Sequence, residues 1–312
     1  MIINNKITTK NRYISYDRTS RLNKVSTFSN NLKKFLYVIL IFFLSITVIT
    51  VTSCEKKTLL EIHIIDVEQG DSSLIISPDG KSMLIDAGEE EYSRNVIREL
   101  KKSNLKKIDY IIGTHYDSDH IGGIDKVTKK FDVGEVLLPD DKKNTDELME
   151  IFQVCNEKNI AIKKVSSGDV INLGKKTKIY ILSPGKIYDE ANQNSIVFLM
   201  DNDSKYYMFT GDADSEIENE IMIQYKLPRC EFLKVGHHGS KTSSCDKFIS
   251  EISPKISTIS CGYKNSYGHP HKEVLSTLKI HQSKIYRTDI NGTMTFYFDK
   301  SKIYTSKPYT YE

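Results

Sequence analysis

The stretch from Thr114 to Gly123 constrains this chain of 312 residues more than any other. It places two imidazoles and two carboxylates within the six residues from His115 to His120, directly after the apolar pair Ile111-Ile112, which predicts the end of a buried strand. So many ionisable groups in one loop repel one another or titrate poorly unless a cation neutralises them. The loop therefore predicts a metal site, and its two closing glycines predict a tight turn beneath it.

Strands and helices alternate along residues 59–300. β-Branched runs such as Leu59 to Val67 predict strands, and apolar periodicity predicts helices, as over Thr145 to Asn156. Ser195 to Met200 and Tyr206 to Phe209 predict a hairpin with its turn at Asn202-Asp203. The strands are too numerous for a helical bundle, and the helices are too regular for a sandwich of sheets alone. We expect an α/β architecture of two sheets packed face to face with helices outside.

The N-terminal part of the sequence predicts attachment to a membrane. Residues 1–34 hold eight lysines and arginines against one acid, Asp17, so we expect a basic cytoplasmic tail. Residues 35–52 carry no charge and are just long enough to cross a bilayer core. We therefore expect a transmembrane or signal segment over residues 35–53, a linker over 54–58 and one folded domain over 59–312.

The end of the apolar run, Val51-Thr52-Ser53-Cys54, resembles the lipobox of bacterial lipoproteins, in which cleavage leaves a cysteine for lipid attachment. The basic tail is longer than a usual signal n-region, which leaves an uncleaved single-span anchor as the alternative. Both interpretations attach the chain to the cell membrane and place the folded domain on its extracytoplasmic side.

Six of the eight histidines fall in three short loops. Beyond the opening cluster they are His237, His238, His269 and His271. An acidic turn at Asp212 follows another expected strand. Since loops at strand ends are where α/β proteins assemble their sites, these loops together predict one metal centre. The isolated His63 and His281 are expected to be structural.

These motifs resemble the metallo-β-lactamase superfamily and, more narrowly, the extracellular hydrolase domain of ComEC-type DNA-uptake proteins. The resemblance covers about residues 59–300 and rests on Asp66 to Asp71, Leu84 to Gly88, Thr114 to Gly123, Asn194-Ser195, Gly211-Asp212, Val235 to Ser240, Tyr267 to His271 and Arg287 to Asp289. It implies an αββα sandwich, preceded here by the single N-terminal membrane segment. It also implies two divalent metal ions, zinc or manganese, at one edge of the sandwich.

The resemblance implies a role for each site residue. The expected metal ligands are His115, Asp117, Asp119, His120, Asp212 and His238, with Asp212 shared by both ions. Asp119 would also orient the hydroxide between the metals, and His237 or His269 would stabilise the developing charge or protonate the leaving group. The expected substrate contacts are Asn194, Ser240 and His271, although His271 could instead cap a helix. Asp66 is expected to brace the ligand loop through hydrogen bonds.

The chain departs from most of the superfamily in one respect. Residues 121–211 contain no histidine, although a further strand histidine is usual there. Asn194 is the residue expected in that neighbourhood. An oxygen-rich second site makes manganese a candidate beside zinc.

The resemblance favours a phosphodiester substrate, with DNA as one candidate, attacked outside the membrane by the metal-bridging hydroxide. The alternatives are a phosphorylcholine-type esterase, a lactam or lactone hydrolase, and a non-catalytic, metal-stabilised binding module of an envelope or DNA-uptake complex. Tyr116 and Tyr267 lie in the site loops and are candidates for stacking on a base. The sequence names no protein partner.

Overall fold

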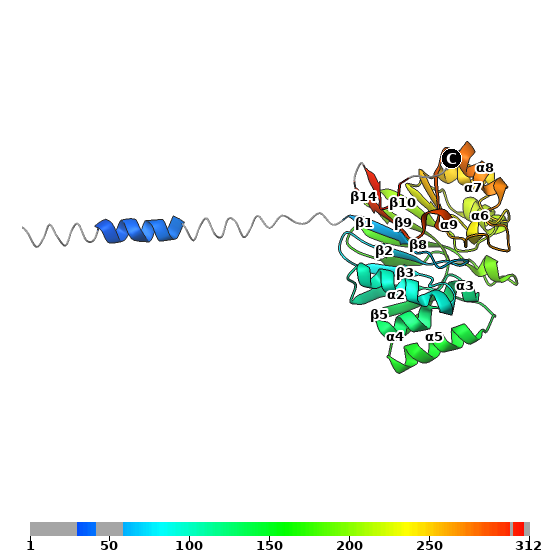
Figure 1. Ribbon diagram of the computed structural model, residues 1–312, viewed down its shortest axis with the longest axis horizontal. Helices are drawn as coiled ribbons and strands as arrows, with labels where there is room; N and C mark the ends of the chain where they lie inside the picture. The colour runs from blue at the N-terminus through cyan, green and yellow to red at the C-terminus, as the bar shows by residue number, and fades with distance from the viewer. Residues whose placement is uncertain (1–29, 42–58, 300–301, 309–312) are drawn as a thin grey trace, which may run out of the picture. The chain divides into compact units, whose positions relative to one another are not determined.

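The computed structural model of the protein describes residues 30–41, 59–299 and 302–308 (Figure 1). The chain divides into two compact units, Met1–Lys57 and Thr58–Glu312. In the first unit a helix covers residues 30–41. Among the described residues, no helix combines the length and the apolar character needed to cross a membrane. Most of the predicted segment 35–53, with Cys54 and the linker 54–58, lies outside the described residues, and the membrane attachment stays a prediction.

The first sheet of the second unit has eight strands. In spatial order they are β15 (Ile303–Thr305), β14 (Met294–Phe298), β1 (Leu60–Ile64), β2 (Ser73–Ile76), β3 (Ser82–Ile85), β4 (Lys107–Ile112), β5 (Asp132–Pro139) and β6 (Ala161–Val165). The strands from β15 to β3 pair antiparallel, whereas those from β3 to β6 run parallel.

The second sheet has seven strands. In spatial order they are β13 (Lys284–Arg287), β12 (Ile256–Ile259), β11 (Phe232–Lys234), β10 (Lys205–Phe209), β9 (Val197–Asn202), β8 (Thr177–Ser183) and β7 (Val170–Asn172). It too is mixed, because β10 to β13 run parallel while β7 to β10 pair antiparallel.

Helices cover the outer faces of the sheets. The α-helices are α2 (Ser93–Lys102), α3 (Ser118–Ile121), α4 (Ile124–Lys130), α5 (Asp146–Glu157), α6 (Ser215–Gln224), α7 (Asp246–Ile252), α8 (Lys272–Ile280) and α9 (Thr288–Asn291), and the 3-10 helices are η1 (Glu90–Tyr92), η2 (Ala191–Asn194) and η3 (His237–Gly239). Polar caps set their starts: Thr145 Oγ1 accepts from Leu148 N at 3.2 Å in α5, and Asp214 Oδ1 accepts from Ile217 N at 3.1 Å in α6.

Three apolar clusters define the layers. One lies between the sheets and combines residues of both, such as Ile62 of β1 and Phe198 of β9. A second packs α2, α4 and α5 on the outer face of the first sheet, and a third packs α6, α7 and α8 on the outer face of the second. Figure 1 shows the two groups of helices on opposite sides of the sheets. The expected α/β architecture of two packed sheets is confirmed.

The predicted hairpin is confirmed as β9 and β10, but its turn lies one residue later than expected. Asp203 and Ser204 make the turn, both with positive φ, at 54° and 65°. Asn202 stays in the strand because its Oδ1 accepts a hydrogen bond of 2.9 Å from Thr177 Oγ1 on the neighbouring strand β8. The side-chain anchor therefore decides where the strand ends.

The loops that carry the expected site leave the carboxyl ends of parallel strands. β4 leads to Thr114, β10 leads to Asp212, and β11 leads to His237. Ile196 N donates to Thr114 O at 2.8 Å and joins the loops of the two sheets. The fold thus gathers distant segments at one edge, where α/β proteins place their sites.

Alternation along β1 leaves His63 on the outer face of the first sheet, where α2 covers it. The ring is 4% exposed, with Nδ1 3.2 Å from Glu99 Oε1 and Nε2 3.3 Å from Glu61 Oε2. Burial alone would lower the pKa of His63, but the hydrogen bonds to Glu61 and Glu99 outweigh it and raise the pKa above 6.5. The structural role expected of His63 agrees with these contacts.

We expect the protonated His63 to stabilise the fold in a pH-dependent way. Because the folded chain holds this proton more tightly than the unfolded chain, the contribution is complete below pH 6.5 and is lost as the pH rises through the folded pKa. His63→Gln should lower the free energy of unfolding by about 1–3 kcal/mol at a pH of about 6, and by less at a pH of about 8, in urea titrations followed by circular dichroism.

The matched control is His281→Gln, which removes a solvent-facing pair between His281 Nε2 and Asp246 Oδ1 at 2.9 Å. It should change the free energy of unfolding by less than about 1 kcal/mol at either pH. An equal loss at both pH values for His63→Gln would show that the charge of His63 does not contribute.

Candidate metal centre

The opening cluster is presented by the loop after β4 and the short helix α3. His115 and His120 are fully buried, while Asp117 and Asp119 reach the surface. The glycines that follow are needed for close approach and not for unusual angles: Gly123 has φ −92°, but a Cβ on it would lie 2.4 Å from Ala87 O. The tight turn is therefore as expected, but the glycines are required by the short distances to neighbouring atoms and not by a positive φ.

Asp86 braces this loop. Its Oδ1 accepts from Thr114 N at 2.8 Å, and its Oδ2 accepts from Thr114 Oγ1 at 2.7 Å and lies 2.8 Å from His120 Nδ1. The expectation that Asp66 would brace the loop is wrong, because Asp66 Oδ1 instead accepts from Glu68 N, at 3.1 Å, within its own turn. Asp86 orients His120 so that its Nε2 points into the centre.

The structure brings the expected ligands together in two overlapping groups. Ligand atoms of His115, His120 and Asp212 lie within 4.8 Å of one another, as do those of Asp119, His120 and His238. Asp212 lies between the groups: its Oδ1 is 3.3 Å from His120 Nε2 and its Oδ2 is 3.4 Å from His238 Nε2. This placement agrees with the shared role expected of Asp212.

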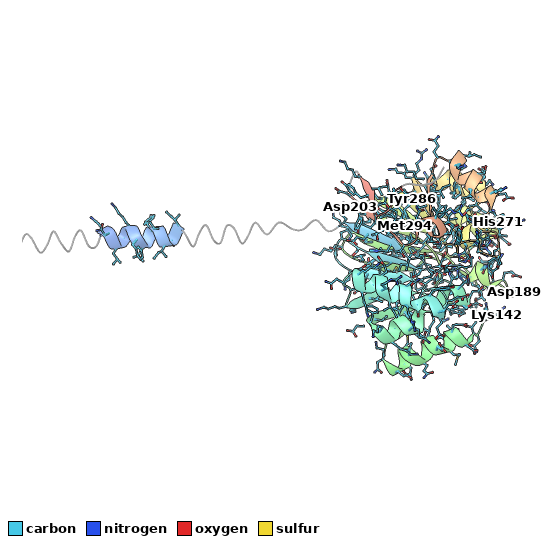
Figure 2. The ribbon with its side chains drawn as sticks, in the orientation of Figure 1. Lys142, Asp189, Asp203, His271, Tyr286 and Met294 are labelled. Carbon is cyan, nitrogen blue, oxygen red and sulfur yellow. The ribbon has the colours of Figure 1, made fainter. Side chains whose placement is uncertain are left out.

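Asp117 lies at the margin of the first group. Its Oδ2 is 3.8 Å from His115 Nε2, while its Oδ1 forms an ion pair with Lys143 on the loop before α5. A neighbouring ion pair, 3.2 Å between Lys142 Nζ and Asp189 Oδ1, joins that loop to the segment before η2 (Figure 2). The pair of Lys143 with Asp117 thus lies at the rim of the centre, whereas the pair of Lys142 with Asp189 is exposed to solvent.

The gathered atoms fit a divalent metal ion. Within the described part of the chain, Nε2 of His115, His120 and His238 and Oδ1 of Asp212 are buried without a hydrogen-bond partner. The other ring nitrogen is engaged in each case, as when His238 Nδ1 meets Ser260 O at 3.1 Å. Buried nitrogen and carboxylate atoms that converge without partners are what a zinc-type site requires.

Electrostatics indicate the same demand for positive charge. Burial opposes ionisation of Asp212, yet the fields of His120 and His238 hold the pKa of its carboxyl well below the usual value. Burial likewise opposes charging of His238, but Asp212, Asp119 and Asp71 raise its pKa to about 10. The carboxylates thus favour positive charge on His120 and His238, whose pKa values are raised, whereas burial and the charge of His120 lower the pKa of His115.

His237 and His238 occupy an unusual turn, η3. Their φ values of 48° and 52° lie in the left-handed region, which costs energy for residues with a Cβ. Gly239 follows with φ 80°, and a Cβ on it would lie 2.6 Å from Pro270 Cβ. This backbone buries His238 and leaves the side chain of His237 26% exposed, while Nε2 of both rings approaches Asp212 Oδ2, at 3.4 Å for His238 and 3.9 Å for His237.

A cleft of about 590 Å³ opens over the centre. Its lining residues are Gln69, Glu89, Tyr116, Asp117, Ser118, Asp119, Lys143, Thr145, Glu147, Asn192, Asp212, His237, His238, Tyr267 and His269. It therefore includes both histidines expected to act on substrate. Burial, and then the charges of His238, His237 and His271, lower the pKa of His269 to about 4.

The expected substrate contact Asn194 does not reach this cleft. It is fully buried, with Oδ1 accepting from Tyr188 N at 2.8 Å and Nδ2 donating to Tyr188 O at 3.0 Å. The next residue, Ser195, approaches the centre instead: its Oγ accepts from Asp212 N at 3.1 Å and lies 3.4 Å from His115 Nδ1.

Ser240 and His271 also lie outside the cleft lining. Ser240 is 5% exposed, and its Oγ accepts from Thr242 Oγ1 at 3.0 Å. His271 Nδ1 accepts from Lys241 N at 3.1 Å, directly before α8. His271 is the N-cap residue of α8 by position, but its side chain makes no capping hydrogen bond to the described residues of that helix and instead accepts from Lys241 N.

Two residues that the sequence analysis did not select lie behind His238. Lys234 Nζ donates to Asp71 Oδ2 at 2.7 Å, both side chains are buried, and Asp71 Oδ1 is 3.5 Å from His238 Nδ1. A lysine in the middle of the apolar run Phe232 to Val235 was the available signal. Buried lysines require a partner, and this one identifies Asp71.

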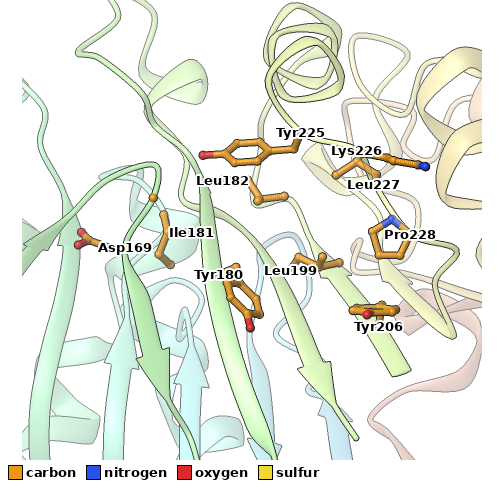
Figure 3. A pocket seen from close by; sticks show the side chains of 11 residues that line it. Asp169, Tyr180, Ile181, Leu182, Leu199, Tyr206, Tyr225, Lys226, Leu227 and Pro228 are labelled. Atoms are coloured by element: carbon orange, nitrogen blue, oxygen red, sulfur yellow. The ribbon is translucent and has the colours of Figure 1, made fainter. Parts of the chain in front are cut away.

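A second cavity, of about 410 Å³, lies away from these residues (Figure 3). Its walls are mainly apolar and come from β8, β9 and the segment after α6, including Leu182, Leu199, Tyr225 and Leu227. Among the described residues that line it there is no histidine. The first cleft, and not this cavity, is therefore the candidate functional site.

Bacterial competence and recombination proteins are similar to this chain. ComE operon protein 3 of Bacillus subtilis (strain 168) is 33% identical over 268 residues, which are 80% of this chain and 34% of the relative. Recombination protein 2 of Haemophilus influenzae is 28% identical over 269 residues, 84% and 32% of the two chains, and Competence protein ComA of Neisseria gonorrhoeae is 26% identical over 234 residues, 74% and 31%. The chain thus spans about a third of the length of these relatives.

Among solved structures, the metallo-beta-lactamase fold protein YhfI from Bacillus subtilis superposes with a TM-score of 0.53 over 80% of this chain and 100% of that one, at 13% identity. At that identity the likeness is one of fold. The family described as the Metallo-beta-lactamase superfamily matches residues 65–263, more than half of the chain and all of the gathered ligands. The chain belongs to the metallo-beta-lactamase superfamily.

Proposed function

We propose that this protein is a metal-dependent hydrolase that cleaves a phosphodiester, with DNA as the leading candidate, outside the cell membrane. The observation that carries the hydrolase assignment is the convergence of unpartnered atoms of His115, His120, His238 and Asp212 beneath an open cleft. The phosphodiester assignment is supported by similarity to proteins whose names refer to recombination and to competence, Recombination protein 2 and Competence protein ComA.

The residues that would hold the metal ions fall into the two observed groups, with Asp117 joining His115 at the rim. Two divalent ions held there would supply Lewis acidity and would lower the pKa of a bound water. On the His115 side the gathered ligands are the imidazoles of His115 and His120 and the carboxylate of Asp212, with the carboxylate of Asp117 at the rim. This balance of nitrogen and oxygen ligands suits zinc or manganese.

The chain's own residues would orient the attack and receive the charge. Asp119 lines the cleft with its side chain 27% exposed, and its Oδ2 lies 3.2 Å from His238 Nε2, so it can orient a nucleophilic water. His237 Nδ1 lies 3.1 Å from Thr242 Oγ1, and this contact turns Nε2 toward the cleft, 3.4 Å from Asn192 Nδ2. The ring held in this way lies where it can contact the attacked phosphoryl group, and Asn192 Nδ2 supplies an amide donor beside it.

The extracytoplasmic location is part of the proposal. It is supported by the uncharged run of residues 35–52 and by Lys33 and Lys34 before it, which favour retention of the basic tail in the cytoplasm. A lipoprotein attached through Cys54 and a single-span anchor both fit this arrangement.

A phosphorylcholine-type esterase is the second candidate, because two carboxylates that are not among the gathered ligands, Glu89 and Glu147, also line the cleft. Negative charge beside the site favours a substrate with a cationic group. Lactam or lactone hydrolysis and a purely binding role have no such supporting contact.

The first test concerns Asp119. With bis-p-nitrophenyl phosphate and added Mn²⁺ or Zn²⁺, Asp119→Ala should lower kcat by about 10²- to 10⁴-fold, because the water loses its orienting carboxylate. Asp189→Ala, which alters only the exposed pair with Lys142, should leave the rate unchanged. An unchanged rate for Asp119→Ala would remove this site from the proposal, and absence of cleavage of any phosphodiester, ester or lactam with either metal would favour the binding module.

The second test concerns the brace behind His238. Lys234→Met leaves Asp71 buried without its cation, so Asp71 should no longer hold His238 in place. Affinity for Zn²⁺ or Mn²⁺, measured by competition with a chelator, should fall by about 10- to 100-fold. Lys255→Met is the control, because Lys255 pairs with Glu231 at 2.8 Å on the surface.

The double variant Asp71→Asn with Lys234→Met separates positioning from folding. It removes both buried charges, so thermal stability should recover relative to Lys234→Met alone. Metal affinity should stay low because the asparagine has no carboxylate to offer His238. Recovery of both quantities together would contradict a positioning role for this pair.

A further inference from the structure

The loop over residues 262–268, between β12 and α8, carries two exposed aromatic rings, of which Tyr267 lines the cleft. Tyr263 is 67% exposed and Tyr267 is 65% exposed, and Tyr267 lines the cleft together with His269. Tyr116, the other tyrosine of the lining, is 1% exposed and donates its hydroxyl to Pro139 O at 2.5 Å, so its ring is not available. Exposed aromatic rings beside a reactive centre are characteristic of binding surfaces.

Tyr267 is connected to the centre through stacked rings. Its ring lies parallel to that of His269, with centroids 5.6 Å apart and planes 18° apart, and His269 in turn stacks on His238 at 6.1 Å and 25°. The stack runs from the surface to an expected metal ligand. A planar group placed on Tyr267 therefore lies next to the group that the metal centre would attack.

The loop is held in this conformation before any substrate arrives. Asn265 Nδ2 donates to Gly262 O at 3.0 Å and to His269 O at 2.6 Å, while its Oδ1 accepts from His269 N at 3.0 Å. Gly262 N donates to Gln69 Oε1 at 3.1 Å, which ties the loop to another residue of the cleft. Binding on a fixed loop loses little conformational entropy.

The aromatic loop also carries a cation. Lys264 Nζ lies 5.2 Å from the centroid of the Tyr263 ring, whereas the cleft lining itself holds the acids Glu89, Asp117, Asp119, Glu147 and Asp212. A cation at the aromatic loop repels a choline group and attracts the phosphates of a polyanion. The loop therefore suits an uncharged ring carried on an anionic backbone.

We propose that Tyr267, assisted by Tyr263 and Lys264, is a stacking surface for the nucleobase next to the scissile phosphodiester, so that the site selects single-stranded nucleic acid. The inference rests on the proposed phosphodiesterase function and adds the residues that set its specificity. The strand is single because a base paired and stacked within a duplex exposes neither face to a tyrosine.

The test compares three phosphodiesters that share the p-nitrophenyl leaving group and carry methyl, thymidine or choline as the second substituent. The wild-type full chain, with Mn²⁺ or Zn²⁺, should have the lowest KM for the thymidine ester. Tyr267→Ala should raise that KM by about tenfold and leave kcat and the methyl ester unchanged, and Tyr267→Phe should keep the wild-type KM. Tyr304→Ala, which alters an exposed tyrosine of β15, is the control.

Binding of fluorescein-labelled oligothymidylate, followed by anisotropy without turnover, tests the same surface independently of catalysis. Tyr267→Ala should weaken it about tenfold, and a duplex of the same sequence should bind the wild type less well. Cleavage of none of the esters would overturn the proposed function, while the binding result would still decide the role of Tyr267. Equal effects of Tyr267→Ala on all three esters, a preference for the choline ester, or unchanged oligothymidylate binding would overturn the stacking surface.

Discussion

The burial of three carboxylates where the two sheets meet is the constraint on which the rest of the site depends. Asp71, Asp86 and Asp212 are each less than 5% exposed, and a buried carboxylate without compensation costs several kcal/mol. Lys234 neutralises Asp71, and the loop after β4 together with His120 satisfies Asp86. Asp212, the third, has imidazoles and, among the described residues, no lysine beside its carboxylate oxygens. The negative charge that is left without a fixed cation therefore lies at the centre of the cleft.

The same negative charge explains why strain is tolerated at η3. Two consecutive histidines with positive φ cost energy, but they allow Nε2 of both rings to approach Asp212 Oδ2, at 3.4 Å for the buried His238 and 3.9 Å for the more exposed His237. A regular helix or strand could not give neighbouring side chains both of these positions with the same backbone direction. The distribution of duties between adjacent histidines is therefore a property of the turn and not of the residue type.

The sequence predicts the segments of this site better than it predicts the individual side chains. Apolar periodicity was sufficient to predict two packed sheets. The loops at strand ends were sufficient to predict that the segments carrying His115, Asp212 and His238 converge. They could not show that Ser195, and not Asn194, lies beside His115. The side chains of these adjacent residues point in different directions, which are set by η2 and the start of β9. Nor could the sequence reveal pairs such as Lys234 with Asp71, which are 163 residues apart and meet only after both sheets have formed.

The lining of the cleft gives the site a direction. Among the described residues that line it, the acids are balanced by one lysine, Lys143, which pairs with Asp117. The loop that carries Tyr267 instead offers an exposed ring to the cleft, with the cation of Lys264 on the same loop. A phosphodiester attacked at the metal centre would therefore extend its neighbouring base toward the aromatic loop. A polyanion could then bind a centre that is itself rich in carboxylates, because bound divalent ions would offset the charges of Asp119 and Asp212.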